Sequence, residues 1–374
     1  MKIGILTLPL HTNYGGLLQA YALQTVLERM EHNAVVLDTP NKKEILKCGY
    51  LLTIIKRCIN KVLFRKGKKI LYEQWYNKTY PIISKNTQPF IDKNIHRFEI
   101  ADLKLLPKKK FDVFVVGSDQ VWRPIYFKMA YDTEIKHAFL DFAREWNVKR
   151  IAYAVSFGTD KWEYTENETN LCSQLLQKFN AVSTRENSGV ELCRKHLGVE
   201  AVQVVDPTML LDKNDYIALF AATGTPVSKG NLLCYILDES KEKLDIIDYV
   251  AKTKELKPFK VNSKVGDSTL PLEKRIQPPV ESWLRGFYDA EYVVTDSFHA
   301  CVFSIIFQKP FIVIGNKKRG LARFQSLLEI FGLEDCIAQD LESVKLADID
   351  WDRVSSILQH KREEAITYLS NALK

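Results

Sequence analysis

Residues 2–37 read KIGILTLPLHTNYGGLLQAYALQTVLERMEHNAVVL, and this stretch decides the fold. A short apolar run at 2–8 is followed by a loop with a glycine pair, and apolar residues then recur three and four apart over 17–30. A second apolar run follows at 34–37. These features predict a strand, a loop, a helix and a second strand. This βαβ order implies parallel strands joined by a right-handed crossover.

The same pattern continues along the chain. Brief continuous apolar runs, rather than alternating ones, are typical of strands that helices cover on both faces. Before a linker-like segment at 212–230, we expect strands at 113–116, 151–155, 181–183 and 202–205 and a helix at 188–196. After it, we expect strands at 231–237, 258–262, 292–295 and 311–314 and helices at 240–253, 281–289, 299–307 and 321–331. The predicted fold class is α/β, with two doubly wound Rossmann-like domains, 1–215 and 216–374, that face a cleft.

Composition places the protein among globular chains. The 374 residues are 46% hydrophobic and 26% charged, and no apolar stretch approaches the roughly 18–20 residues of a membrane span. Seven scattered cysteines without a C-x-x-C pair predict neither a disulfide framework nor a zinc or redox site. The N-terminus does not resemble a secretory signal. We therefore expect a cytoplasmic protein that uses no metal and no cofactor.

One segment concentrates the positive charge. Residues 42–69 hold ten basic side chains and one acidic side chain, whereas the net charge of the whole chain is +7. Apolar residues in this segment recur at spacings of three and four, which predicts a basic amphipathic insertion. It either contacts an anionic membrane surface or covers the domain core with its lysines in solvent. Nucleic acid is not an expected partner, because no recognition motif accompanies the patch.

Polar side chains gather where the predicted strands end, which is where open α/β sheets bind their ligands. The glycine pair that follows strand 2–8 suits an anion beside free helix N–H groups, or a plain tight turn. Arg185, after strand 181–183, is placed to bind a carboxylate or phosphate, or to form a salt bridge. His299 follows strand 292–295 and opens a helix, whose N-terminus would lower its pKa and keep it neutral for proton exchange.

Two further loops carry candidate binding residues. The loop after strand 113–116 suits a sugar that stacks on Trp122 and hydrogen-bonds Asp119, although a structural tryptophan beside a capping residue is the alternative. The cationic loop 315–323 predicts an anion clamp or a solvated surface loop. The predicted substrate-binding residues are Asn13, Gly15, Gly16, Gln19, Ser118, Gln120, Trp122, Ser297, Lys317, Arg319 and Arg323.

Six motifs, in this order, resemble the polysaccharide pyruvyl transferase family over residues 1 to about 335. They are Asn13-Tyr14-Gly15-Gly16-Leu17-Leu18-Gln19-Ala20-Tyr21-Ala22, Gly117-Ser118-Asp119-Gln120-Val121-Trp122, Ser183-Thr184-Arg185-Glu186, Asp206-Pro207-Thr208, Thr295-Asp296-Ser297-Phe298-His299-Ala300 and Arg323-Phe324-Gln325-Ser326-Leu327-Leu328. The resemblance implies a fold like that of two-domain (GT-B-like) glycosyltransferases. It also implies that the enolpyruvyl group of phosphoenolpyruvate is transferred to a pair of glycan hydroxyls in capsule or exopolysaccharide biosynthesis. The products would be a cyclic pyruvate ketal and phosphate.

The resemblance implies roles for three residues. Arg185 would hold the carboxylate or phosphate of phosphoenolpyruvate. His299 would be the acid that protonates the enol carbon or the leaving phosphate, and Asp119 is the predicted base on the acceptor. A sugar or lipid-linked oligosaccharide is the implied acceptor, and the basic insertion 42–69 fits an acceptor carried on a membrane lipid.

One position departs from the family pattern. Many relatives carry an arginine two residues before the motif histidine, where this chain has Ser297. Phosphate binding would then fall to Lys317, Lys318, Arg319 or Arg323. Two alternatives stay open at this point: a nucleotide-sugar-dependent glycosyltransferase of the same architecture, and a catalytically silent binding protein.

Overall fold

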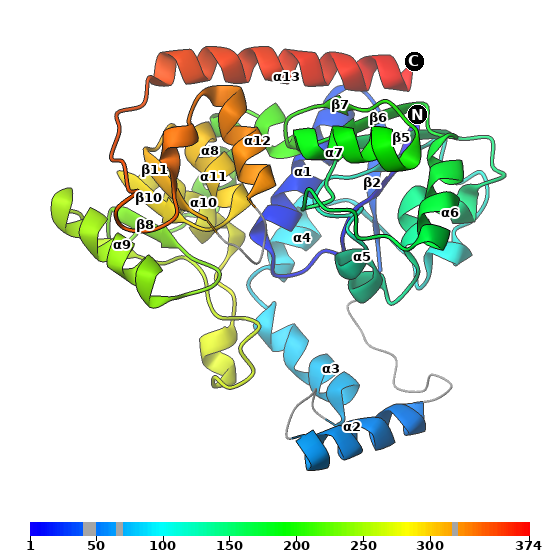
Figure 1. The fold of residues 1–374 in the computed structure, drawn as a ribbon, viewed down its shortest axis with the longest axis horizontal. Coiled ribbons are helices and arrows are strands. Elements are labelled where there is room, and N and C mark those ends of the chain that lie inside the picture. The colour runs from blue at the N-terminus through cyan, green and yellow to red at the C-terminus, as the bar shows by residue number, and fades with distance from the viewer. Residues whose placement is uncertain (40–49, 65–69, 316–320) are drawn as a thin grey trace.

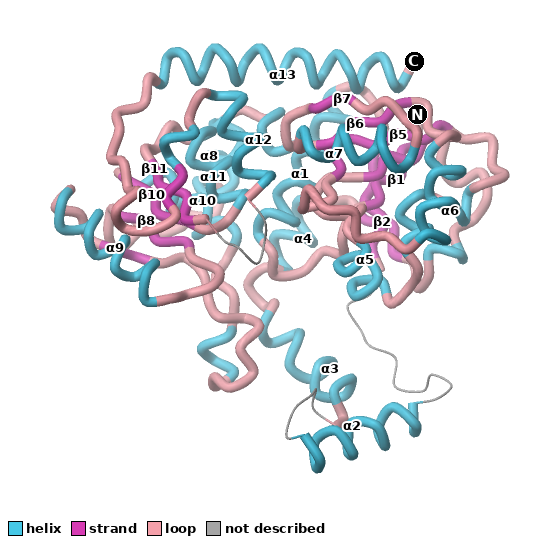
Figure 2. Tube along the Cα trace, in the orientation of Figure 1, coloured by secondary structure: helices cyan, strands magenta, loops and turns pink. Residues whose placement is uncertain are grey.

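The computed structural model describes residues 1–39, 50–64, 70–315 and 321–374, which form two parallel β-sheets beside each other (Figure 1). The first sheet has the strand order β3-β2-β1-β4-β5-β6-β7, and the second has the order β12-β11-β10-β8-β9. Each pairing within the two sheets is parallel. Helices surround the strands of both sheets (Figure 2). The predicted α/β class with two doubly wound sheets is confirmed.

Most strands lie close to the predicted apolar runs, with ends that differ by a few residues, but β3 and β12 were not predicted. The first sheet contains β1 (Lys2–Leu6), β2 (Asn33–Asp38), β3 (Arg97–Glu99), β4 (Val113–Val116), β5 (Lys149–Val155), β6 (Ala181–Thr184) and β7 (Val202–Gln203). The second contains β8 (Leu232–Tyr235), β9 (Pro258–Phe259), β10 (Tyr292–Thr295), β11 (Phe311–Ile314) and β12 (Ile337–Ala338). The central strands are buried over their whole length, as continuous apolar runs require.

The sequence predicted a helix within the basic insertion, where α2 lies, but it did not predict α3 to α6, α8 or the C-terminal helix. The bounds of the described helices are α1 (Tyr14–Arg29), α2 (Tyr50–Phe64), α3 (Tyr72–Ile83), α4 (Gln88–Asn94), α5 (Pro124–Tyr131), α6 (Glu166–Leu176), α7 (Asn187–Leu192), α8 (Lys213–Ala221), α9 (Lys241–Thr253), α10 (Val280–Asp289), α11 (Phe298–Ile306), α12 (Ala322–Phe331) and α13 (Trp351–Leu373). Helix α1 begins at Tyr14 rather than at residue 17, because the side chain of Asn13 accepts a hydrogen bond from the N–H of Gly16 and caps it there.

Two segments join the sheets. The predicted linker 212–230 contains α8, which Asp212 caps and which packs against α10 of the second sheet. The C-terminal helix α13 falls in the predicted domain 216–374, yet it runs along both halves of the molecule (Figure 1). Near its start Ser355 accepts a hydrogen bond from Gln308, and near its end Tyr368 donates to the carbonyl of Ala152 in β5. Part of the predicted second domain therefore packs on the first sheet.

The start of α1 also contacts the second half of the chain. Tyr14 is fully buried, and its hydroxyl donates to the carbonyls of Val261 and Pro278 at 3.1 and 2.8 Å. Its ring lies 5.5 Å from that of Trp283 on α10. The glycine pair that follows Tyr14 is thereby held against the second sheet, and this contact positions the site described below.

Helices α2 and α3 lie apart from the two sheets (Figure 1). Arg57 joins them through two hydrogen bonds of 2.7 Å to Glu73. Leu52, Ile55 and Ile59 of α2 are 65%, 52% and 48% exposed, so the described part of the insertion 42–69 does not cover the domain core, and that alternative is wrong. None of the helices in the described ranges is long and apolar enough to cross a membrane.

Candidate functional site

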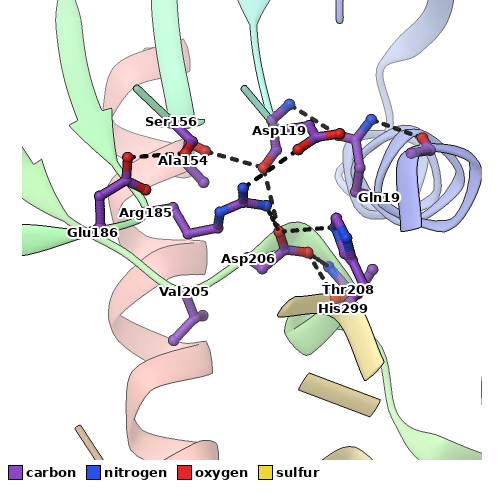
Figure 3. Close-up of polar contacts among 12 residues, drawn as sticks. Gln19, Asp119, Ala154, Ser156, Arg185, Glu186, Val205, Asp206, Thr208 and His299 are labelled. Carbon is purple, nitrogen blue, oxygen red and sulfur yellow. Dashed lines mark hydrogen bonds and ion pairs between the residues drawn. The ribbon is translucent and has the colours of Figure 1, made fainter. Parts of the chain in front are cut away.

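Residues from three strand ends and one helix start meet in a buried cluster (Figure 3). Asp119 follows β4, Arg185 follows β6, and Asp206 follows β7, so the parallel topology places all three at the same edge of the first sheet. His299 is the second residue of α11 and comes from the second sheet. Residues far apart in sequence thus form one site, as the predicted topology required.

Asp206 is the centre of the cluster. Its Oδ2 lies 2.6 Å from Nη1 of Arg185 and 3.7 Å from Nε2 of His299. Its Oδ1 accepts hydrogen bonds from the N–H and hydroxyl of Thr208 at 3.0 and 2.7 Å. Nη2 of the same arginine lies 3.5 Å from Oδ1 of Asp119. The guanidinium therefore joins two carboxylates, and Oδ2 of Asp206 faces both the guanidinium of Arg185 and the imidazole of His299.

The protonation states follow from these contacts. Burial by itself raises the pKa of Asp206, but Arg185 and His299 together hold that pKa below its usual value. The same balance of burial against His299, Arg185 and Arg323 lowers the pKa of Asp119. Burial lowers the pKa of His299 below 6.5 although both carboxylates oppose it. At neutral pH the cluster holds two carboxylates and a neutral imidazole.

The imidazole of His299 packs directly against Gly15 in the first turn of helix α1. A Cβ atom built on Gly15 would lie 2.1 Å from Nδ1 of His299, so glycine is required for the ring to occupy this place. The neighbouring Gly16 has no such contact, since its Cβ would lie 3.5 Å from the nearest atom. The first glycine of the pair is therefore needed for the close approach of a side chain across the two halves of the molecule.

Two arginines share one aromatic ring beside the cluster. Cζ of Arg185 lies 4.3 Å and Cζ of Arg323 lies 5.6 Å from the ring centroid of Phe298. Burial, followed by repulsion from Arg185, lowers the pKa of Arg323 to about 10. Among the residues that the structure describes, no hydrogen-bond partner is found for three buried atoms here: Nε of Arg185, Nε of Arg323 and Nε2 of His299. Buried donors without partners are rare, and an anion would satisfy the two guanidinium groups.

A cleft of about 1020 Å³ lies between the two halves, and His299 lines it together with Asn13, Gly15 and Ser297. Basic side chains of the second half line its far side, where Lys260 and Lys264 each lie 2.6 Å from a carboxylate oxygen of Glu239. The cleft is therefore large enough for a sugar and a small anion, and the predicted histidine stands at its inner wall.

Some predicted binding residues have structural contacts instead. Gln19 is fully buried, and its side chain accepts from the N–H of Ser118 at 2.9 Å and donates to Thr7 at 2.9 Å, so it fastens the loop after β4 to β1. Gln120 accepts a hydrogen bond from Arg123. Lys317, Lys318 and Arg319 lie outside the described residues, so their predicted role is not tested.

The prediction that Trp122 stacks on a sugar is wrong. The indole is fully buried, donates to the carbonyl of Ala138 at 3.2 Å and stacks on Phe139 with centroids 4.7 Å apart. The ring packs within an apolar core of the first half of the chain. Trp122 is therefore a structural tryptophan, as the alternative interpretation stated. Likewise Glu186 does not pair with Arg185; it accepts from Ser156 and from the N–H groups of the loop after β5.

Asp206, Thr208 and Phe298 belong to the site but were not among the predicted site residues. The sequence did contain a signal, because Asp206-Pro207-Thr208 is one of the six motifs that carried the family resemblance. Its role was not predictable, since the partners of Asp206 come from β6 and α11. Across the described ranges, no group of three or more His, Cys, Asp or Glu side chains is arranged to hold a metal ion.

Replacing Asp206 with asparagine is expected to lower the free energy of unfolding by about 3–5 kcal/mol, because it leaves Arg185 buried beside an uncharged partner. Urea unfolding followed by circular dichroism measures the change. Asp335→Asn is the matched control, since this carboxylate pairs with Lys345 on the surface at 2.6 Å and its loss is expected to leave the unfolding midpoint unchanged. Equal effects of the two substitutions on the free energy of unfolding would show that the buried pair contributes no more to stability than the surface pair.

The fold and the site define a two-domain α/β protein with a cleft between its sheets and a buried Arg–Asp–His cluster at the cleft wall. The model of the polysaccharide pyruvyl transferase family matches residues 13–318. The match spans most of the chain, which therefore belongs to the polysaccharide pyruvyl transferase family, a family of transferases that act in polysaccharide biosynthesis.

Solved structures are similar to this chain over its whole length at low sequence identity. UDP-GlcNAc 2-epimerase from Neisseria meningitidis shares 9% identity with a TM-score of 0.49 and covers 100% of this chain and 99% of its own. The enzyme of the same name from Methanocaldococcus jannaschii shares 12% with a TM-score of 0.42, covering 96% and 92%. HepE from Anabaena, in complex with UDP-glucose, shares 12% with a TM-score of 0.45, covering 100% and 98%. No protein with a curated description matches the chain.

Proposed function

We propose that this protein transfers the enolpyruvyl group of phosphoenolpyruvate to two hydroxyls of one sugar in a capsule or exopolysaccharide precursor, giving a cyclic pyruvate ketal and phosphate. Membership of the pyruvyl transferase family supports a transferase, and one observation supports the choice of donor. Arg185, Arg323 and His299 each have a buried nitrogen without a hydrogen-bond partner, and both arginines lie against the ring of Phe298, the residue before His299. A small molecule with a carboxylate and a phosphate matches two guanidinium groups and an imidazole.

The proposed chemistry begins with proton transfer from His299 to the methylene carbon of phosphoenolpyruvate. This step leaves an oxocarbenium-like centre at the adjacent carbon, and a sugar hydroxyl attacks it. The second hydroxyl of the same sugar then displaces phosphate and closes the ketal. Of the two hydroxyl protons released, one restores the histidine and the other leaves with the phosphate. Asp119 is the proposed acceptor of the first hydroxyl proton, which it then passes to His299, and its lowered pKa keeps it ionised before that step.

Asp206 has a positioning role in this proposal. It faces Nε2 of His299 at 3.7 Å while it bonds Arg185 at 2.6 Å. The arriving anion attracts Arg185 and places negative charge beside the imidazole, and both effects raise the pKa of His299. The histidine would thus take up its proton together with the donor and act as an acid only in the complex.

Replacing Arg323 with methionine tests the donor assignment. The lowered pKa of Arg323 shows that its charge is disfavoured in the free protein, so we expect the free energy of unfolding to stay equal or rise. Affinity for phosphoenolpyruvate is expected to fall about 10- to 100-fold, the loss of one charge-assisted contact. Isothermal titration calorimetry with phosphoenolpyruvate gives the affinity, and thermal unfolding gives the stability.

Lys345→Met is the matched control for this substitution, because the Lys345 side chain is 63% exposed and pairs with Asp335 on the surface. It is expected to change neither quantity. If wild-type protein binds UDP-sugars but not phosphoenolpyruvate, the donor assignment is wrong and the nucleotide-sugar alternative takes its place. Acceptor-dependent phosphate release from phosphoenolpyruvate then tests the full reaction.

We also propose that helix α2 contacts the inner face of the cytoplasmic membrane, where a lipid-linked acceptor would lie. The exposed Leu52, Ile55 and Ile59 recur at helical spacing beside the exposed Lys56. Replacing Ile55 and Ile59 with glutamine is expected to abolish sedimentation with phosphatidylglycerol vesicles. Leu244→Gln, an equally exposed position on α9, is the control. Binding that survives the double substitution, or that is as strong on neutral vesicles, would contradict the proposal.

A further inference from the structure

A second cavity, of about 610 Å³, lies beside the cleft. Thr12, Val265 and Gly266 line both cavities, so the second adjoins the first. One wall of the second cavity is a face of α3, and we call this cavity the aromatic groove. Nothing in the proposed reaction of phosphoenolpyruvate uses it.

The α3 wall consists of aromatic rings with polar edges. Tyr72, Trp75, Tyr76 and Tyr80 lie three and four residues apart and therefore share one side of the helix. The ring centroids of Tyr76 and Tyr80 are 5.2 Å apart and stacked, and those of Tyr72 and Tyr76 are 6.0 Å apart. Burial raises the pKa of Tyr76 to about 12, so its hydroxyl stays protonated at neutral pH. Flat apolar faces with hydroxyls at their edges are suited to sugar rings.

The opposite wall comes from the second half of the chain and is held in place. Arg275 is 5% exposed; its Nε and Nη2 donate to the carbonyl of Val265 at 3.1 and 2.8 Å, and its Cζ lies 5.3 Å from the ring of Trp75. Gln277 connects this wall to α3: its side chain accepts a hydrogen bond from the N–H of Ser263, and its N–H donates to the carbonyl of Ile83 at the end of α3. The guanidinium is thus engaged within the wall, and the groove is formed before any ligand enters.

His11 lies where the groove approaches the catalytic cluster. It lines the groove, and its electrostatic interaction with Asp119 opposes the burial that lowers its pKa. Nδ1 of His11 accepts a hydrogen bond from the N–H of Asn13 at 3.3 Å, so the neutral ring carries its proton on Nε2. This arrangement offers a hydrogen-bond donor between the aromatic wall and the carboxylate that is proposed to deprotonate the acceptor.

We infer that the aromatic groove binds the sugar unit adjoining the one that receives the pyruvyl group, so that the protein recognises at least a disaccharide. This inference rests on the proposed function for the identity of the reacting sugar. The groove adjoins the cleft that His299 lines, and its lining combines aromatic ring faces with the neutral imidazole of His11. A hydrocarbon chain would leave the Nε2–H of His11 without a hydrogen-bond acceptor, so a saccharide fits the lining better than a lipid tail.

Two substitutions test the groove. Tyr76→Ser removes a ring from its wall, and Ser268→Trp fills it from an exposed loop position without altering the core. With phosphoenolpyruvate saturating, kcat/KM is measured for methyl glycosides of disaccharides and of monosaccharides. Both variants are expected to lose about tenfold or more in kcat/KM for disaccharides relative to monosaccharides, and to keep the wild-type affinity for phosphoenolpyruvate. Tyr249→Ser, a 41% exposed tyrosine on α9, is the control and is expected to match wild type.

The outcomes separate this inference from the proposed function. If wild-type protein turns over phosphoenolpyruvate but the variants treat both acceptor classes alike, the groove assignment is wrong and the function stands. If no acceptor supports phosphate release, the function fails. Saturation-transfer NMR with the same methyl disaccharides then decides the groove: binding that Ser268→Trp abolishes supports it. Absence of binding, or binding of a polyprenyl phosphate alone, overturns it.

Discussion

Replacing His299 with glutamine is expected to lower acceptor-dependent phosphate release from phosphoenolpyruvate by a factor of about 10²–10⁴, the usual contribution of a positioned acid. The glutamine amide retains a hydrogen-bond donor toward Asp206 but has no proton to transfer. Affinity for phosphoenolpyruvate is expected to change little, because the two arginines remain. The loss therefore falls on kcat rather than on donor binding, and stopped-flow phosphate detection together with calorimetry separates the two.

The role of His299 as an acid also predicts the direction in which kcat/KM changes with pH. Because burial lowers the pKa of His299, the free protein carries a neutral imidazole at neutral pH. We therefore expect kcat/KM for phosphoenolpyruvate to rise as the pH falls through that lowered pKa, and this limb to be absent in His299→Gln. His360→Gln is the matched control, since the His360 side chain is 70% exposed on α13. A pH profile that persists in His299→Gln would assign the acid to another group.

Replacing Gly15 with alanine is expected to reduce kcat by about two orders of magnitude, although the change adds one methyl group. The new Cβ would lie 2.1 Å from Nδ1 of His299, so the imidazole must leave its place. Displacement of a reacting group by about 1 Å is sufficient for a loss of about 10²-fold. Steady-state kinetics measures the loss, and the circular dichroism spectrum is expected to match wild type.

Gly16→Ala is the control that isolates this contact. Its Cβ would meet Asn13 at 3.5 Å, an ordinary contact, and alanine favours the first turn of α1. We expect unchanged activity and slightly higher stability. In a His299→Ala background, Gly15→Ala is expected to have no further effect on kcat, because the ring that it displaces is absent. Independent, multiplying losses would show that Gly15 acts through something other than His299.

The sequence was sufficient to predict the two sheets because continuous apolar runs mark buried parallel strands. It was also sufficient to place Arg185 and His299 at strand ends, since topology brings those ends to one edge. The apolar spacing in 42–69 predicted the amphipathic helix α2, whereas α3 was not predicted, because it packs away from the sheets and its apolar residues do not mark one buried face.

Side-chain direction was the harder problem. Trp122 and Asp119 lie in the same loop, yet the indole enters the core while the carboxylate meets Arg185. Nothing local decides between these directions, because packing against Phe139, which is distant in sequence, fixes the ring. The contact between Gly15 and His299 likewise joins the two halves of the chain, and its cause is visible only when both halves are in place.

Helix α13 has a mechanical consequence for the cleft. Its first part is bonded to the second half of the molecule through Ser355 and Gln308, and its last part is bonded to the first sheet through Tyr368 and the carbonyl of Leu373. A rod of 23 residues, about 34 Å long, thus bridges both halves on one side of the molecule (Figure 1). The two halves cannot separate freely on that side. Any widening of the cleft therefore pivots about α13 and is greatest on the side of the cleft opposite this helix. That side faces α3, and a long glycan would enter there.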